Sequence, residues 1–177
     1  MIYIVCFIIS GGALALDLIT KYLAVKNEFN FVVIPNLLKF HLSFNKGAAF
    51  SFLSGKSWAQ TFFIILTFIA LALILSYFVF KIVKKQKPSW WIAVALSLMF
   101  AGALGNLIDR LSFKMVRDFI LLFYDTDIFP AIFNVADVCL VSGVITMCFY
   151  LLFIDKDGLF KKKPKEEEES GKKTDNG

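Results

Sequence analysis

Four long runs of apolar residues dominate the chain. They cover residues 2–23, 59–80, 90–111 and 132–154, and each can cross a bilayer core, which takes about 20 helical residues. A backbone inside lipid must satisfy its own hydrogen bonds, so four separate runs with charged connections favour helices over a closed barrel. We therefore expect an all-α membrane protein with four transmembrane helices.

The segment between the first two apolar runs and the segment between the last two do not have the composition of membrane spans. The stretch FVVIPNLLKFHLSF, residues 31–44, is typical of short strands joined by a Pro-Asn turn. The stretch MVRDFILLF, residues 115–123, fits either an apolar helical face along the outer membrane interface or a short strand. We expect a small extracytoplasmic β-sheet and an interfacial segment. Residues 1–155 then form one domain, and the charged, low-complexity residues 156–177 form a disordered cytoplasmic tail.

Composition agrees with a membrane protein, because 58% of the 177 residues are apolar and 21 are Phe. The first run has an alternative interpretation as a signal peptide, since ALA at residues 13–15 resembles a cleavage site. No Lys or Arg precedes this run, and it continues past that point to Leu23. A retained span is therefore favoured.

Positive charge predicts the orientation of the spans. Short cytoplasmic loops collect Lys and Arg, and KIVKKQK at residues 81–87 holds four lysines while the tail holds seven. Both termini should then be cytoplasmic, with residues 24–58 and 112–131 outside, although these outer segments also carry basic residues at lower density. The net charge of +5 is mainly a topology signal, so we expect no nucleic-acid partner.

The cysteines and the single histidine exclude several chemistries. Cys6, Cys139 and Cys148 lie in predicted spans without metal-ligand spacing, and no nucleophile-elbow pattern accompanies His41. A zinc site would have few ligands, and a Ser-His-Asp triad would depend on His41 alone. We expect neither a metal nor a cofactor.

Polar residues in three of the four spans fall at one depth. Counting about 1.5 Å per helical residue, Asp17 lies about 22 Å and Asn106 about 24 Å above the cytoplasmic ends of their spans. The fourth span descends from outside and begins with polar residues at the same level. Helical spacing places each set on one face. We call this set the polar layer: Asp17, Lys21, Asn106, Asp109, Arg110, Asn134 and Asp137.

Small residues flank the polar layer and should let the helices approach closely. They are Gly11, Gly12 and Ala13 in the first span and Gly102, Ala103 and Gly105 in the third.

Asp118 and Asp137 form a candidate carboxylate pair near this layer. Two close carboxylates tend to share a proton, so that one can activate water while the other protonates a carbonyl oxygen. Ionisable groups are costly in a span, and pairing or function is the default inference. Inter-helix salt bridges, an ion path in a small transporter or channel component, and an assembly subunit without catalysis all remain open. A Ser-Lys peptidase is another alternative, using Ser43 or Ser51 with Lys21 or Lys46.

Five ordered sequence blocks resemble the bacterial lipoprotein signal peptidases, also called signal peptidase II. The blocks are DLITK at 17–21, NKGAAFS at 45–51, AGALGNLIDR at 101–110, VRDFI at 116–120 and FNVADV at 133–138. The resemblance implies a bacterial cell-membrane aspartyl endopeptidase with its site at the outer face. It implies cleavage of diacylglyceryl-modified prolipoproteins just before the lipidated cysteine, contact with membrane phospholipid, and inhibition by globomycin.

The resemblance also implies roles for individual residues. The family's catalytic dyad matches Asp118 and Asp137, and five other family site positions match residues here. Those five are Asp17, Asn45, Asn106, Arg110 and Asn134. The expected supporting set also includes Lys21, Gly47 and Asp109. Three positions depart from the usual pattern, namely Leu18, Arg117 and Val138. None of these departures removes a catalytic carboxylate.

Overall fold

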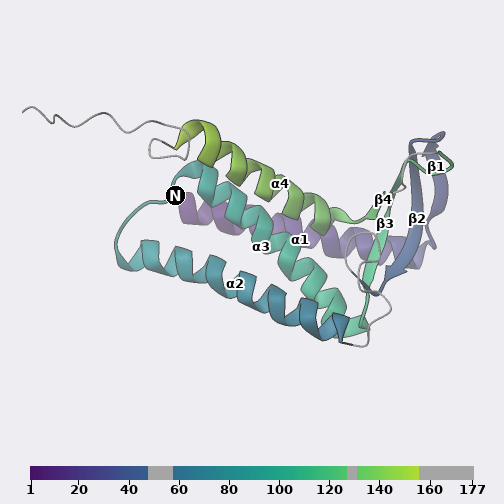
Figure 1. The fold of residues 1–177 in the computed structure, drawn as a ribbon, viewed down its shortest axis with the longest axis horizontal. Helices are drawn as coiled ribbons and strands as arrows, with labels where there is room; N and C mark the ends of the chain where they lie inside the picture. The colour runs from purple at the N-terminus through teal and green to yellow at the C-terminus, as the bar shows by residue number, and fades with distance from the viewer. Residues whose placement is uncertain (48–57, 127–130, 156–177) are drawn as a thin grey trace, which may run out of the picture.

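The computed structural model describes residues 1–47, 58–126 and 131–155, and in this part of the chain four helices are long and apolar enough to cross a membrane. Figure 1 shows them side by side, with the β-strands gathered at the end opposite the N-terminus. The expected all-α membrane architecture is confirmed. The helices are α1 (Ile2–Lys26), α2 (Ala59–Val83), α3 (Trp90–Phe113) and α4 (Val135–Phe149), the last extended by the π-helix η2 (Tyr150–Ile154).

Helix α3 is the central element of the bundle and contacts each of the other three helices. Half of the residues in the most apolar 18-residue stretch of α3 are buried inside the protein, whereas only 11% are buried in the corresponding stretch of each other span. Small side chains make this possible, because Ala93, Ala95 and Ala101 are buried with almost no exposed surface. The other helices present large apolar side chains outward, where lipid would surround them.

Close helix contacts occur at glycines of α3 and α4 but not of α1. A Cβ on Gly102 would collide with the Ala136 carbonyl oxygen and lie 2.9 Å from Leu140 Cγ, and one on Gly105 would collide with the Asp17 carboxylate. A Cβ on Gly11 or Gly12 would meet nothing within 4 Å. The expected close approach is thus confirmed for α3 and wrong for Gly11 and Gly12, because these two residues face away from the neighbouring helices.

The strands form one antiparallel sheet in the order β1-β2-β3-β4. The expected hairpin in the first outer segment is present, and residues 115–123 supply a strand rather than an interfacial helix. In the pairing of β2 with β3, Ser43 lies opposite Asp118, and in that of β3 with β4, Ile120 lies opposite Phe133. The strands are β1 (Asn30–Ile34), β2 (Leu38–Asn45), β3 (Val116–Leu122) and β4 (Ala131–Phe133).

This sheet connects the segments that follow α1 and α3 to the helix ends that carry the polar layer. Strand β3 follows α3 after a left-handed turn at Lys114, and β4 leads through Asn134 into α4. Aromatic rings of Phe29, Phe40 and Phe119 pack against one another, and Phe119 is only 2% exposed. The rings anchor β3, and with it Asp118, to the hairpin.

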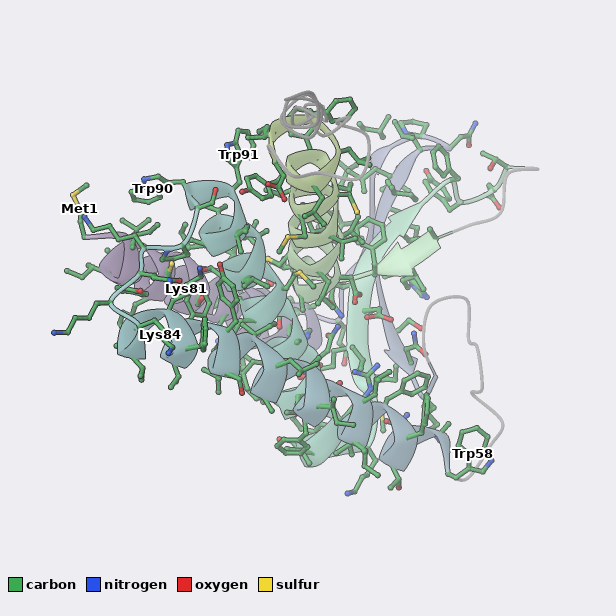
Figure 2. The ribbon with its side chains drawn as sticks, turned by 60° about the vertical axis from the view of Figure 1, so that its left-hand side comes forward. Met1, Trp58, Lys81, Lys84, Trp90 and Trp91 are labelled. Atoms are coloured by element: carbon green, nitrogen blue, oxygen red, sulfur yellow. The ribbon has the colours of Figure 1, made fainter. Side chains whose placement is uncertain are left out.

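The two ends of the bundle differ in their surface residues. In Figure 2, Met1, Lys81, Lys84, Trp90 and Trp91 lie toward one end, and Trp58 lies at the opposite end. Lys81 and Lys84 thus lie at the end away from the sheet. The predicted tail, residues 156–177, lies outside the described residues.

Candidate active site

A capping box at the start of α4 fixes the orientation of Asp137. The backbone N–H of Asp137 donates to Asn134 Oδ1 at 3.0 Å, and the backbone N–H of Asn134 donates to Asp137 Oδ2 at 3.1 Å. These reciprocal bonds satisfy two backbone donors that a helix N-terminus otherwise leaves free. The sequence analysis did not identify this cap, although an Asn followed three residues later by an acidic residue before an apolar run is its signal.

Asn134 also connects α4 to Asp118 in the sheet. Its Nδ2 donates to Asp118 Oδ1 at 2.7 Å, while Asn45 Nδ2 donates to Asp118 Oδ2 at 3.0 Å. Asp118 is 2% exposed and Asn134 is fully buried. A single asparagine therefore contacts both aspartates of the candidate pair, one through its side-chain amide and the other through the helix cap.

Asn106 of α3 completes the set of amides around Asp137. Its Nδ2 donates to Asp137 Oδ1 at 2.8 Å, and its Oδ1 accepts from Lys21 Nζ at 3.0 Å and from Asn134 Nδ2 at 3.2 Å. Both oxygens of Asp137 consequently accept hydrogen bonds. Residues distant in sequence, from α1, α3 and α4, meet at this point.

Asp17 and Lys21 form the part of the polar layer contributed by α1. Lys21 Nζ lies 2.8 Å from Asp17 Oδ2 and 3.5 Å from Asp109 Oδ2, and its side chain is fully buried. Asp17 Oδ1 accepts the backbone N–H of Ala136 at 2.9 Å. The α1 carboxylate thus binds the first turn of α4, where negative charge is favoured by the helix dipole.

Asp109 has a partner that the sequence analysis did not anticipate. Arg117 Nη2 lies 2.5 Å from Asp109 Oδ1, and the Arg117 backbone N–H and Nε both donate to Asp109 Oδ2. Arg110 instead places its guanidinium over the Phe63 ring, 5.2 Å from the centroid. Arg110 Nε is buried without a hydrogen-bond partner among the described residues.

Asn45 and Gly47 bring the first outer segment to the pair. The Gly47 backbone N–H donates to Asn45 Oδ1 at 2.8 Å, which directs the Nδ2 end of the same amide toward Asp118. Gly47 is buried. Residues 48–57, which include the rest of the NKGAAFS block and Ser51, lie outside the described part of the chain.

The surroundings of Asp118 favour its protonated form. Burial and the nearby negative charge of Asp137 raise the pKa of Asp118 from 3.8 to about 7, against the opposing hydrogen bonds from Asn45 and Asn134 and the charge of Lys21. A carboxyl that holds its proton near neutral pH can act as a general acid. Asp137 lies in the first turn of α4, and its two carboxylate oxygens accept hydrogen bonds from Asn106 and from the Asn134 backbone.

The arrangement can therefore perform acid–base chemistry with two carboxyl groups in different environments. Among the described residues, no group of three or more His, Cys, Asp or Glu side chains has a geometry that could hold a metal ion. Each site residue named from the sequence falls within this network or directly beside it. Arg117 is the addition to that set.

Comparison with known proteins agrees with this architecture. Lipoprotein signal peptidases of Staphylococcus aureus strains JH9 and Newman are each 42% identical over 142 residues, or 77% of this chain and 80% of theirs. A solved bacterial membrane enzyme has 37% identity and a TM-score of 0.73, covering 92% of this chain and 94% of its own. A second gives 38% identity and a TM-score of 0.69, covering 85% and 94%.

A family model described as signal peptidase (SPase) II matches residues 9–153, which include most of α1, all of α2, α3 and α4, and the whole polar layer. With four helices able to cross a membrane, the protein is a multi-pass bacterial membrane protein. The resemblance in the five sequence blocks is confirmed, and the chain belongs to the signal peptidase II family.

Proposed function

We propose that this protein is an aspartyl endopeptidase that removes the signal peptide from diacylglyceryl-modified prolipoproteins, cutting before the lipidated cysteine. Its relatives carry the name lipoprotein signal peptidase, which supports the substrate class. The observation that carries the aspartyl mechanism is the joint contact of Asn134 with Asp118 and Asp137. Through this contact, a carboxyl group on a strand and a carboxyl group at a helix start lie at the same end of the helix bundle.

In the proposed reaction Asp137 is the base and Asp118 the acid. Ionised Asp137 removes a proton from water, whose oxygen attacks the scissile carbonyl carbon, while protonated Asp118 donates its proton to the carbonyl oxygen. The tetrahedral intermediate then breaks its C–N bond, and the leaving amine takes up a proton from the dyad. The raised pKa of Asp118 supports this division of roles.

Three neighbouring residues are suited to holding the substrate. The unpartnered Nε of Arg110 can donate to a carbonyl or ester oxygen of the lipidated segment. Asn45 and Gly47 lie on the sheet side of Asp118, where a short residue lets a peptide backbone come close. Asp17, Lys21, Asn106, Asp109 and Asn134 support the dyad by fixing its hydrogen bonds.

The membrane itself supplies part of the substrate recognition. Two acyl chains are ample to hold a substrate in lipid, since each buried CH₂ contributes about 0.8 kcal/mol. The end of the bundle that carries the lysines of residues 81–87 would be cytoplasmic and the sheet end extracytoplasmic. The anchor then delivers the cysteine to the outer boundary, where phospholipid surrounds the same helices.

The transporter alternative has no support in the described residues. An ion path would need polar groups that continue through the half of the bundle remote from the sheet. Where the structure describes the chain, seven polar side chains are buried; six of them belong to the site, and the seventh, Ser97, donates to the Ala93 carbonyl of its own helix. Lys21 is likewise engaged by Asp17 and Asn106, which disfavours its use as a base in a Ser-Lys peptidase.

Replacing each aspartate of the dyad by asparagine tests the mechanism. Asp118→Asn and Asp137→Asn keep the side-chain size but cannot ionise, so each should lower cleavage of a lipidated precursor by about 10²–10⁴-fold or more. Purified protein, assayed by gel shift of the precursor, gives the rates. Asp125→Asn, in an exposed turn after β3, is the matched control and should keep the parent rate. Full activity of either dyad variant would eliminate the mechanism.

A further inference from the structure

Arg117 holds both oxygens of a buried carboxylate beside the dyad. Its Nη2 lies 2.5 Å from Asp109 Oδ1, its Nε donates to Asp109 Oδ2 at 3.2 Å, and its backbone N–H donates to the same oxygen at 3.0 Å. The guanidinium is 4.6 Å from the Phe113 ring centroid, and the side chain is only 12% exposed. Such a two-pronged contact fixes orientation as well as charge.

The pair compensates charge at two carboxylates of the polar layer, Asp17 and Asp109. Asp109 is fully buried and Asp17 nearly so, yet Lys21 is the only cation of α1 that reaches them among the described residues. In this part of the chain Arg117 supplies the second cation that forms an ion pair with either of these two carboxylates. A buried charge left without its partner is strongly unfavourable, so without Arg117 both carboxylates would compete for Lys21.

The position of Lys21 in turn determines the orientation of Asn106. Lys21 Nζ donates to Asn106 Oδ1 at 3.0 Å, and the opposite end of that amide, Nδ2, donates to Asp137 at 2.8 Å. An asparagine amide has one accepting and one donating end, and a cation beside Oδ1 selects this orientation. Asn134 Nδ2 donates to the same oxygen at 3.2 Å, so movement of Lys21 toward Asp109 would weaken that selection by removing the charged donor.

We propose that Arg117 is a positioning residue for the dyad. By neutralising Asp109 it leaves Lys21 bound to Asp17 and Asn106, and it thereby keeps Asn106 turned to donate to Asp137. Arg117 acts through these residues rather than on the substrate. The inference rests on the proposed peptidase function, because the group it positions is the proposed base.

A charge-compensated pair of variants tests this role. Arg117→Gln leaves Asp109 uncompensated and should lower kcat by about 10- to 100-fold, as expected when a reacting group is misplaced, with KM within about twofold of the parent. Combining Arg117→Gln with Asp109→Asn removes one charge of each sign and lets the two new amides bind each other. The double variant should therefore be faster than Arg117→Gln alone, which a loss of packing would not produce.

Two further variants complete the experiment. Lys114→Asn removes an exposed positive charge from the same connection and retains a residue type that tolerates its left-handed backbone, so its rate should equal that of the parent. Arg117→Lys keeps the charge without the planar fork, and its kcat should lie between those of the parent and Arg117→Gln. It also tests the idea if Arg117→Gln does not fold.

The outcomes separate this inference from the proposed function. An unchanged kcat in Arg117→Gln, or a double variant no faster than that single variant, would overturn the positioning role while leaving the peptidase intact. If Arg117→Gln does not fold, a parent-like kcat in Arg117→Lys would overturn it in the same way. Absence of cleavage by the parent protein itself would overturn the proposed function, and the positioning role with it.

Discussion

At the scale of single residues, the two aspartates differ because different neighbours surround them. Asp118 lies in a strand, buried beside another carboxylate, and its pKa rises to about 7. Asp137 lies at a helix start and accepts hydrogen bonds from Asn106 and from the Asn134 backbone. Paired carboxyl groups whose environments push their protonation apart are suited to be acid and base.

The pH dependence of cleavage should follow Asp118. Because the acid must hold its proton, kcat should fall as pH rises through about 7, the value to which burial and Asp137 raise this pKa. The Asn45 hydrogen bond lowers that pKa, so Asn45→Ala should move the alkaline limb of the kcat profile to higher pH. Measuring kcat of the parent and of Asn45→Ala over about four pH units, from roughly pH 5 to 9, gives the shift of the alkaline limb.

His41→Gln is the control for this pH measurement. Histidine ordinarily titrates in the same range, and His41 is the single histidine of the chain, placed on β2 with Asn30 as its neighbour at 3.4 Å. Its substitution should leave the alkaline limb in place. A limb that disappears in His41→Gln, or that moves to lower pH in Asn45→Ala, would contradict the assignment of the acid.

At the scale of elements, the site depends on how closely α3 and α4 approach. Gly102 of α3 contacts the backbone of α4 at Ala136, directly beside Asp137, and Gly143 of α4 returns the contact against Met99. Helices in lipid associate through close packing of small residues, since lipid offers no hydrophobic gain for association. The contact that joins α3 and α4 therefore also determines the position of Asp137 along the helix axis relative to Asn106.

Gly102→Ala should destabilise the protein by about 1–3 kcal/mol, the usual cost of overpacking a close contact. The added Cβ would collide with the Ala136 carbonyl oxygen, and a backbone atom cannot rotate away as a side chain can. Thermal unfolding in detergent measures the effect. Gly12→Ala, whose Cβ meets nothing within 4 Å, is the matched control, and equal losses in both variants would disprove the role of the contact.

Much of the arrangement was accessible from the sequence because helical periodicity is regular. The depths and faces of Asp17, Asn106 and Asp137 follow from counting residues along straight helices. Asn106 does donate to Asp137, and Asp17 accepts the backbone N–H of the adjacent Ala136. The partner of Asp109 was not accessible in this way. Arg117 reaches it because a left-handed turn at Lys114 brings the start of β3 beside the last turns of α3, and the sequence of that segment was also compatible with a helix.

At the scale of the whole molecule, the two ends of the bundle have different chemistry. The sheet and the carboxylates occupy one end, and Lys81, Lys84 and the N-terminus occupy the other (Figures 1 and 2). Cytoplasmic loops of membrane proteins are rich in Lys and Arg. This polarity would place the proposed cleavage at the outer face, with the buried charges protected between the helices and the sheet.

Cysteine labelling in intact cells tests this orientation. In a background without Cys6, Cys139 and Cys148, a membrane-impermeant thiol reagent should label Lys114→Cys, which is exposed between α3 and β3. The reagent should not reach Lys85→Cys, exposed in the loop between α2 and α3, until the cells are opened. Labelling of Lys85→Cys from outside, with Lys114→Cys protected, would reverse the topology.

The central claim is that a lipid anchor delivers the scissile bond to the aspartate pair. Anchoring converts a search in three dimensions into a reaction at fixed depth, an advantage that an unmodified peptide lacks. The direct measurement compares diacylglyceryl-modified and unmodified forms of one precursor at equal concentration in liposomes with purified protein, and maps the cut by mass spectrometry. We expect rapid cleavage of the modified form immediately before its lipidated cysteine, sensitivity to globomycin, and little cleavage of the unmodified form. Equal rates on both forms, or a cut elsewhere, would show that the anchor does not deliver the bond to the aspartate pair.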